Sequence, residues 1–230
     1  MKEARSTMTQ KKTKRMITGH AQAPSTPARG TGTAEAIIDA AIQLWGARGV
    51  DGASLREISI AAGSANNSSI GYHFGDRRGL IEAIFRARMP GLEERRKLLL
   101  EDARVRGLLD DPLTLIEITY QPVFDEIDAQ GCHSFAAFLR AVNRFSEWDG
   151  KAWTQELAPS AFLVMQILMR KANHVPQPLF DARVRLINEI CYGAITDQDK
   201  NQSRAPDATL AKKIFQDGLK ASAHLLFLDV

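Results

Sequence analysis

Residues 61–80 read AAGSANNSSIGYHFGDRRGL, and this stretch decides how the N-terminal part of the chain folds. Two small residues and a glycine are followed by a polar run, an aromatic–histidine–aromatic cluster and two arginines. This composition suits either a loop that holds a phosphate-bearing ligand or the turn and second helix of a helix-turn-helix unit. The chain has no GxxxxGKS/T or GxGxxG pattern, and no strand pattern precedes the stretch. The sequence therefore favours the helix-turn-helix.

The residues before this stretch have the spacing of two amphipathic helices. The apolar residues of the first helix recur three and four positions apart, at Ile37, Ile38, Ala41, Ile42 and Trp45, and Gly49 ends it. Ser54 is predicted to cap the second helix, with Glu57 three residues later as in a capping box. Gly63 can take the positive φ that a tight turn between helices needs. A short third helix is predicted from about residue 66 to residue 73.

The rest of the chain is helical in its spacing and shows no strand pattern. Helices are predicted near 76–106, from Pro112 onward, and over 134–145, 153–171, 179–195 and 210–228, with a polar loop at 196–206. The predicted fold class is all-α, with about nine helices. A flexible basic tail (1–32) precedes a three-helix unit (33–78) and a larger helical domain (79–230).

Composition and charge limit the compartment and the partners. The chain has 230 residues, of which 44% are hydrophobic and 25% charged, so it can bury a sizeable core. No apolar run approaches the roughly 18 residues of a membrane span, and no signal peptide is apparent. Two distant cysteines, Cys132 and Cys191, fit a reduced compartment, so a cytoplasmic protein with no membrane association is predicted.

The charge is unevenly placed along the chain. Residues 1–32 carry seven basic residues and one acidic residue, a net +6, which leaves −3 for residues 33–230 out of the total of +3. A basic tail on a mildly acidic body indicates a polyanionic partner near the N-terminus. A tail that only increases solubility is the alternative.

The polar residues around the predicted third helix have the chemistry of DNA contacts. Short amides and hydroxyls reach base edges, while phenol, imidazole and guanidinium groups donate to phosphate oxygens. The candidate DNA contacts are Ser54, Arg56, Asn66, Asn67, Ser68, Ser69, Tyr72, His73, Arg77 and Arg78. The alternatives are solvated helix surface for the polar run, packing for Tyr72 and His73, and a simple helix cap for Ser54.

These residues together carry a family resemblance. Residues 33–80 resemble the N-terminal DNA-binding domain of the TetR family of bacterial transcriptional regulators, through the IDAAIQLW helix (38–45), SLREI (54–58), AAG (61–63), YHF (72–74) and GDRRGL (75–80). The segment between the Ala-Gly pair and the Phe is one residue longer than the commonest family spacing, and Gly71 stands where an aromatic residue is frequent. The Asn-Asn-Ser before Tyr-His-Phe is typical of a recurrent subgroup, which indicates altered base readout.

The resemblance implies a homodimeric repressor that binds a palindromic double-stranded operator and is released by a small hydrophobic or aromatic effector. In the family the middle helices enclose the effector, which makes Phe135, Phe138, Phe145, Trp148, Trp153, Met165 and Met169 candidate pocket walls, with Arg144, Arg140 and His133 as polar anchors. Plain core is the alternative for each apolar member. The last two helices form the family's dimer bundle, so Ile187, Ile190, Ile214, Leu225, Leu226 and Leu228 are candidate dimer contacts.

Other functions have little support in the sequence. Cys132, His133 and His174 do not form a recognisable metal-ligand spacing, and the cysteines have no basic cluster beside them. No paired-carboxylate motif, nucleophile elbow or cofactor loop is present, so neither catalysis nor a cofactor is predicted. The alternatives are a transcriptional activator, a non-specific DNA binder, or an enzyme or small-molecule carrier with a vestigial DNA-binding unit.

Overall fold

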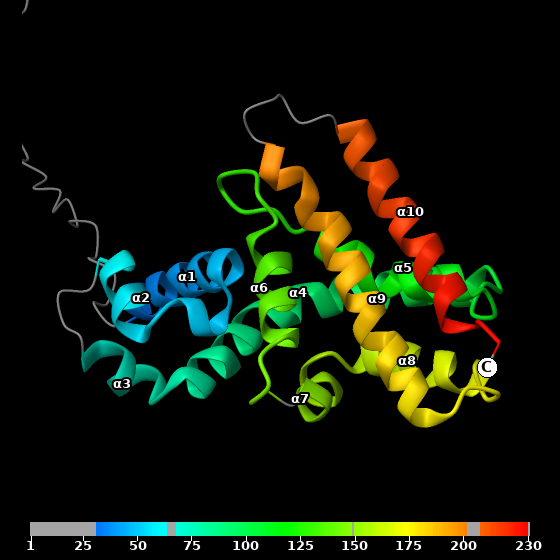
Figure 1. The fold of residues 1–230 in the computed structure, drawn as a ribbon, viewed down its shortest axis with the longest axis horizontal. Helices are drawn as coiled ribbons and strands as arrows, with labels where there is room; N and C mark the ends of the chain where they lie inside the picture. Colours follow the sequence, from blue (N-terminus) through cyan, green and yellow to red (C-terminus); the bar gives the residue numbers. More distant parts are fainter. Residues whose placement is uncertain (1–30, 64–67, 149, 202–207, 230) are drawn as a thin grey trace, which may run out of the picture.

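A computed structural model describes residues 31–63, 68–148, 150–201 and 208–229 of the chain. Within these ranges the chain forms ten α-helices and two short 3-10 helices, and no strand (Figure 1). The predicted all-α class is confirmed. Figure 1 shows a small unit of α1 to α3 at one end of an elongated molecule and the α9–α10 pair towards the other.

The small unit consists of α1 (Thr31–Arg48), η1 (Val50–Gly52), α2 (Leu55–Ala61) and α3 (Ser68–Phe74). The apolar positions that predicted α1 are buried, and Trp45 is fully buried with its indole Nε1 donating to the Ala53 carbonyl at 3.0 Å. Ile58 of α2 and Ile70 of α3 complete this core. The unit is therefore held together by the same residues that gave it helical spacing.

The body consists of α5 (Pro112–Phe124), α6 (Ser134–Asn143), α7 (Gly150–Leu157), α8 (Pro159–Lys171), α9 (Gln177–Asp197), η2 (Gln198–Asn201) and α10 (Ala208–Leu226). The helix predicted over 153–171 is in fact two helices. The chain breaks at Ala158, whose φ of −140° and ψ of 57° are not helical, because the residue before a proline is driven out of the α region. The loop predicted from residue 196 begins later, since α9 runs to Asp197.

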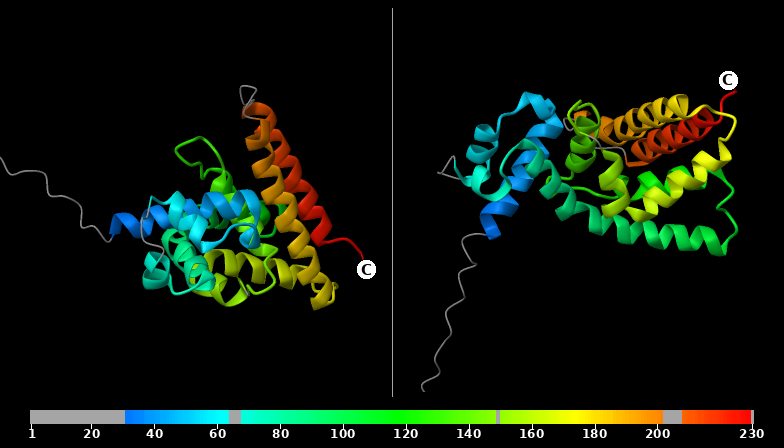
Figure 2. Two further views of the ribbon diagram at one scale, coloured as in Figure 1. Left: turned by 60° about the vertical axis from the view of Figure 1, so that its left-hand side comes forward. Right: turned by 90° about the horizontal axis from the view of Figure 1, so that it is seen from below.

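One long helix joins the two parts. Helix α4 (Arg77–Val105) starts directly after α3 and runs beneath the whole body (Figure 2, right). The side chain of Asp76 caps it by accepting from the Gly79 N–H at 2.8 Å, as the sequence near residue 76 predicted. The predicted boundary between residues 78 and 79 therefore falls within the first turn of a continuous helix.

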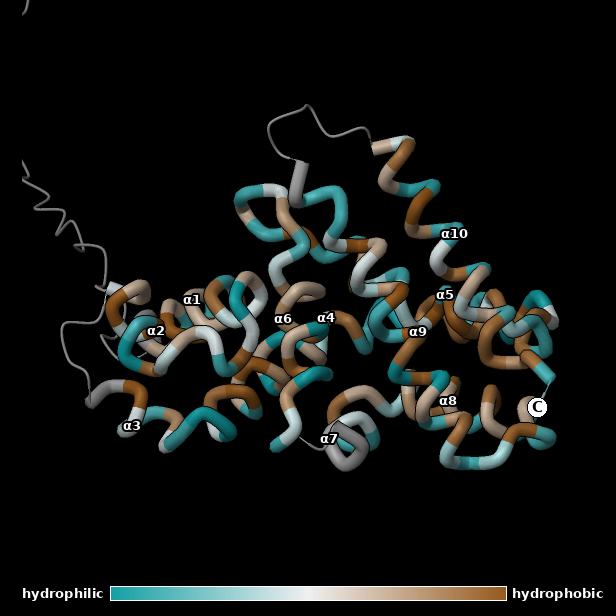
Figure 3. Tube along the Cα trace, in the orientation of Figure 1, coloured by the Kyte–Doolittle hydropathy of each residue, from teal (hydrophilic) through white to brown (hydrophobic). Residues whose placement is uncertain are grey.

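Helices α9 and α10 lie side by side and antiparallel in Figures 1 and 2. They approach closely because Gly218 of α10 faces α9, where an added Cβ would lie 3.2 Å from the Cβ of Ala194. Apolar and polar positions alternate along α10 in Figure 3, as expected for a helix that buries one face. That buried face includes Phe215, Leu219 and Leu226.

Two glycines of α4 test the junction between α3 and α4. An alanine Cβ at Gly79 would lie 1.9 Å from the carbonyl oxygen of Phe74, whereas a Cβ at Gly91 would meet nothing within 4 Å. Gly79→Ala should lower the free energy of unfolding by about 1–3 kcal/mol, because α3 must move away from α4. Gly91→Ala should raise it by about 0.5–1 kcal/mol through helix propensity. Urea unfolding followed by circular dichroism measures both, and stabilisation by both variants would contradict the close junction.

Candidate nucleic-acid interface

Helix α2 begins with the predicted capping box. The Ser54 hydroxyl accepts from the Glu57 N–H at 3.2 Å, and the Ser54 N–H donates to the Glu57 carboxylate at 2.8 Å. The backbone hydrogen bond from Ser54 lowers the pKa of the Glu57 carboxyl. The Ser54 hydroxyl also donates to the same carboxylate at 2.8 Å, so its hydrogen bonds serve the cap. Arg56, in the first turn of α2, is exposed.

The turn after α2 has the geometry that its small residues predicted. Gly63 has a φ of 70°, which is the left-handed region that favours glycine. The Ala62 N–H donates to the Ile58 carbonyl at 2.9 Å and so ends the helix. Asn66 and Asn67 lie outside the described residues. Ser68 and Ser69 begin α3, but their side chains also lie outside the described part of the chain.

Helix α3 has an inner face and an exposed aromatic edge. Ile70 is 2% exposed, whereas Tyr72 is 87% exposed and His73 is exposed beside it. The rings of Tyr72 and His73 meet edge to face with centroids 5.1 Å apart. Gly71 is also exposed, and a Cβ there would meet nothing within 4 Å. Tyr72 and His73, the two predicted phosphate donors, therefore lie on the exposed side of α3, beside the uncovered backbone of Gly71.

The two arginines at the start of α4 have different surroundings. The Arg77 guanidinium donates to the Asp51 carboxylate of η1 at 2.7 Å and lies 5.9 Å from the centroid of the Phe145 ring. Arg78 is more exposed, and within the described part of the chain it pairs with Glu82 of its own helix at 3.1 Å. Arg77 thus joins the small unit to the body, and Arg78 is the freer donor. The contacts with Asp51 and Phe145 could not be predicted from the sequence, because they join residues that are distant along the chain.

Comparison with known families agrees with this geometry. Residues 37–84 match the family model of the bacterial regulatory proteins of the tetR family. The match covers 48 of the 230 residues, so the similarity to the family is confined to the N-terminal DNA-binding domain. A solved structure described as a TetR-family transcriptional regulator from Mesorhizobium loti is 14% identical, with a TM-score of 0.36 over 85% of this chain and 96% of that one. At that TM-score the likeness carries no weight. No curated protein matches the chain.

The aromatic residues predicted to wall an effector pocket lie mostly where the small unit meets the body. Phe138 of α6 stacks with Trp45 of α1 at 6.3 Å and contacts Phe135 and Phe85 at 5.8 and 5.9 Å. Trp148 stacks on Phe85 at 5.3 Å. These five rings form the aromatic seam, in which Phe135 and Phe138 are buried core residues.

The other predicted pocket residues are dispersed. Phe145 is buried against Arg77, while Met165 is half-buried and Met169 is exposed on α8. The side chain of Trp153 lies outside the described residues. The structure therefore does not gather the predicted apolar walls around one site.

The predicted polar anchors already have partners within the chain. Arg140 and Arg144 of α6 both bind Glu189 of α9, and the hydrogen bond from Arg144 lowers the pKa of that carboxyl. His133 is buried, with Nδ1 3.0 Å from Asp199 and Nε2 3.1 Å from the Phe124 carbonyl. These three residues fasten α6 to its neighbours.

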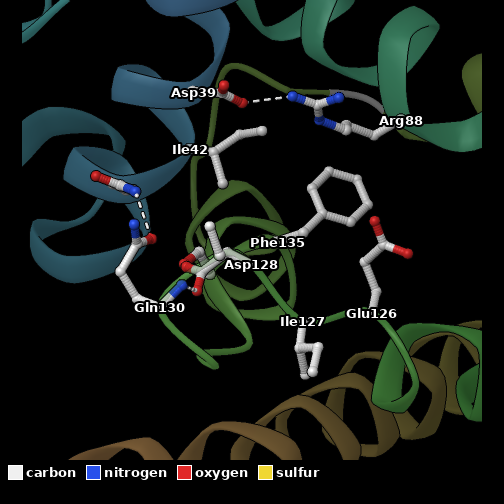
Figure 4. A pocket seen from close by; sticks show the side chains of 11 residues that line it. Asp39, Ile42, Arg88, Glu126, Ile127, Asp128, Gln130 and Phe135 are labelled. Atoms are coloured by element: carbon white, nitrogen blue, oxygen red, sulfur yellow. Dashed lines mark hydrogen bonds and ion pairs between the residues drawn. The ribbon is translucent and has the colours of Figure 1, made fainter.

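A cavity of about 270 Å³ lies beside the seam (Figure 4). It is bounded by α1, α4, the segment after α5 and the start of α6. Its lining is Asp39, Ile42, Gln43, Arg88, Glu126, Ile127, Asp128, Ala129, Gln130, Ser134 and Phe135. Figure 4 shows the Asp39 carboxylate paired with Arg88 across one wall. Among the predicted pocket residues whose side chains the structure describes, Phe135 is the one that lines this cavity.

Two of the predicted dimer contacts are corrected by burial. Ile187 and Leu226 are 2% and 0% exposed within the single chain, because they pack where α9 and α10 meet the body. Ile190, Ile214 and Leu225 are half-buried and Leu228 is exposed. Leu186 and Leu210, which the sequence did not single out, are more than half exposed on α9 and α10.

Within the described ranges, no three residues among His, Cys, Asp and Glu gather in a way that could hold a metal ion. None of the helices described is both long and apolar enough to cross a membrane.

The different surroundings of Arg77 and Arg78 give a test. Arg78→Ala should weaken DNA binding and reduce the salt dependence by about one ion, with stability unchanged within about 0.5 kcal/mol. Arg77→Ala should also lower stability, by about 1 kcal/mol, because it loses the Asp51 and Phe145 contacts. Thermal unfolding and fluorescence anisotropy with labelled DNA measure the two effects. Equal melting temperatures for the two variants would contradict the joining role of Arg77.

Proposed function

We propose that the chain is a ligand-responsive homodimeric repressor that binds a two-fold symmetric operator through α3. The observation that carries the proposal is the outward exposure of Tyr72 and His73 on a helix whose opposite side, at Ile70, is buried against the small unit. A capped α2, a turn with positive φ and a short second helix form the arrangement that places a recognition helix in a major groove. The segment 66–69 supplies the candidate base contacts, and Arg78 a phosphate contact.

A conformational change caused by an effector bound in the body would be transmitted to α3 through two connections. Helix α4 is continuous from the DNA-binding unit into the body, and α6 packs on α1 through the aromatic seam. A ligand releases DNA only as far as it prefers the conformation that cannot bind DNA, with coupling on the order of 1–3 kcal/mol. The effector is proposed to be small and largely apolar, and to bind among α4, α5, α8 and α9.

The dimer is proposed to form through the outer face of α9 and α10. Leu210, Ile214 and Leu225 recur at helical spacing along α10 and are half-buried or exposed, and Leu186 is exposed on α9. Ile190 lies near Gly218 of α10 within the chain and is left out of this surface. A two-fold operator requires two recognition helices about one DNA turn apart, which a dimer provides. These residues would give each copy an apolar contact surface.

Two other functions would give different results. An activator or a non-specific DNA binder has the same helix-turn-helix, and footprinting separates them by whether promoter elements are covered at a discrete site. An enzyme or carrier that uses the small unit only as a tether would be indicated by turnover of a bound compound. We propose no catalytic activity.

Selection of bound sequences from a random DNA pool tests the operator hypothesis. The wild-type protein should enrich a two-fold symmetric motif at ~0.15 M salt. Asn67→Ala should reduce preference for that motif by about 1–3 kcal/mol, because an amide can pair with a base edge. Arg78→Ala should instead weaken binding to all sequences alike. Salt-sensitive binding without any enriched motif would reject the repressor proposal in favour of non-specific binding.

A charge on the outer face of α9 tests the dimer. Leu186→Lys should convert the protein to monomers, because a lysine ammonium would be buried between the two copies. Leu98→Lys is the matched control, since Leu98 is 74% exposed on α4, away from the α9–α10 pair. Light scattering coupled to size-exclusion chromatography gives the mass of each variant. A dimer that survives Leu186→Lys would place the interface elsewhere.

A further inference from the structure

One short stretch of α4 holds an unusual concentration of buried polar atoms. Among the described residues, three buried side-chain atoms have no hydrogen-bond partner, namely Glu93 Oε2, Arg95 Nε and Arg96 Nη1. All three come from four consecutive positions. Buried polar groups in proteins are nearly always paired, so such a cluster calls for a physical explanation. Arg95 already binds the Glu126 carboxylate through its Nη2, which leaves Glu93 and Arg96.

Arg96 is a buried cation that forms no ion pair among the described residues. Its side chain is 4% exposed, and its Nε donates to the Thr119 carbonyl of α5 at 3.2 Å. Burial lowers the pKa of the guanidinium, whereas electrostatic interactions with Tyr192, Glu93 and Tyr120 raise it. Arginine stays protonated in proteins. A buried charge outside any ion pair is costly, and an anion that reaches Nη1 would offset that cost.

Glu93 acts electrostatically on Arg96 but forms no hydrogen bond with it. It is 4% exposed, and its Oε1 accepts from the Ser160 N–H at 2.7 Å. Ser160 lies in the first turn of α8, whose own N-cap residue, Ala158, supplies no side-chain hydrogen bond. Glu93 therefore caps α8 from α4, where a carboxylate is stabilised by the helix N-terminus. Its Oε2 remains free to accept one hydrogen bond.

Aromatic rings with polar edges complete the surroundings. Tyr120 of α5 and Tyr192 of α9 meet edge to face at 5.5 Å, and both act electrostatically on Arg96. The Tyr120 hydroxyl donates to Asn188 at 2.6 Å. Helices α4, α5, α8 and α9 thus converge on Arg96. We refer to Glu93, Arg96, Tyr120 and Tyr192 as the Arg96 cluster.

We propose that the Arg96 cluster is the polar anchor of the effector site, and that the effector is a monocarboxylate attached to an aromatic or other apolar group. This inference rests on the proposed ligand-responsive function. A carboxylate can accept two hydrogen bonds from a guanidinium and neutralises its single charge. A phosphate would bring close to two negative charges next to Glu93, which disfavours it. A bound water would satisfy Nη1 but would leave the charge uncompensated. The tyrosine rings suit the apolar part of the ligand.

Matched acids and amides test the proposal with the full-length protein. The probes are benzoate with benzamide and 2-naphthoate with 2-naphthamide, because each pair differs only in the charged group. The variant is Arg96→Met, which keeps most of the side-chain volume without the charge. Arg104→Met is the control, since Arg104 is exposed on the same helix and pairs only with Glu101. Thermal shift and isothermal calorimetry measure binding.

At least one acid should raise the melting temperature of the wild type and of Arg104→Met, with the matching amide bound at least about tenfold more weakly. Arg96→Met should lose that preference for the acid. Without ligand, Arg96→Met should melt at the same temperature as the wild type or higher, because an apolar side chain replaces an unpaired buried charge. A purely structural arginine would instead make Arg96→Met less stable.

Three results would overturn the inference. They are binding of neither acid to the wild type, undiminished binding of the acid to Arg96→Met, and equal binding of acid and amide. Selection of DNA by the wild-type protein is measured separately and tests the regulator function. Acid binding that depends on Arg96, in a protein that enriches no DNA motif, would support the anchor and reject the repressor.

Discussion

The close packing of α1 against α6 determines how the small unit of α1 to α3 is positioned on the helical body. Gly46 permits it, since an added Cβ would lie 3.1–3.2 Å from Ala137, Phe138 and Ser134. Trp45 stacks on Phe138 in the same contact, and such a pair contributes about 0.5–1.5 kcal/mol beyond its buried area. The opposite side of α6 is held to α9 by Arg140. Any displacement of α6 must therefore be accommodated by both the DNA-binding unit and the α9–α10 pair.

Helix α4 provides the second, more rigid connection. It begins at Arg77, directly after α3, and reaches Arg96 nineteen residues later, a rise of roughly 28 Å. Arg96, a buried charge that forms no ion pair among the described residues, is thus on the same helix that begins directly after α3. A ligand that pairs with Arg96 would change the packing of α4 against α5, because the one hydrogen bond of Arg96 is to the Thr119 carbonyl. No separate relay is needed to reach α3.

Local signals predicted the fold well, and tertiary contacts explain what they missed. The Ser54 cap, the positive φ at Gly63 and the start of α4 after Asp76 depend on residues within one turn of the chain. The aromatic residues of α6 were singled out as candidate pocket walls, but residue type alone does not tell whether a ring faces a cavity or another helix. Phe138 faces Trp45, 93 positions earlier, and no pattern in the sequence encodes that pairing. The same holds for Arg77 and Asp51.

The sequence predicted three polar anchors for the effector and did not single out Arg96, and this difference has a physical cause. Arg144, Arg140 and His133 stand among aromatic residues and have a partner in the chain, whereas Arg96 stands in the charged run EERRK (93–97). Such a run suggests a solvated helix face. Yet Leu92, Arg96 and Ala103 share a face at helical spacing, and all three are buried. A charge at an apolar position of the helical repeat is therefore the sequence signal for this site. The neighbouring charged residues make this signal hard to recognise, because only the position of Arg96 in the helical repeat distinguishes it from the solvated charges beside it.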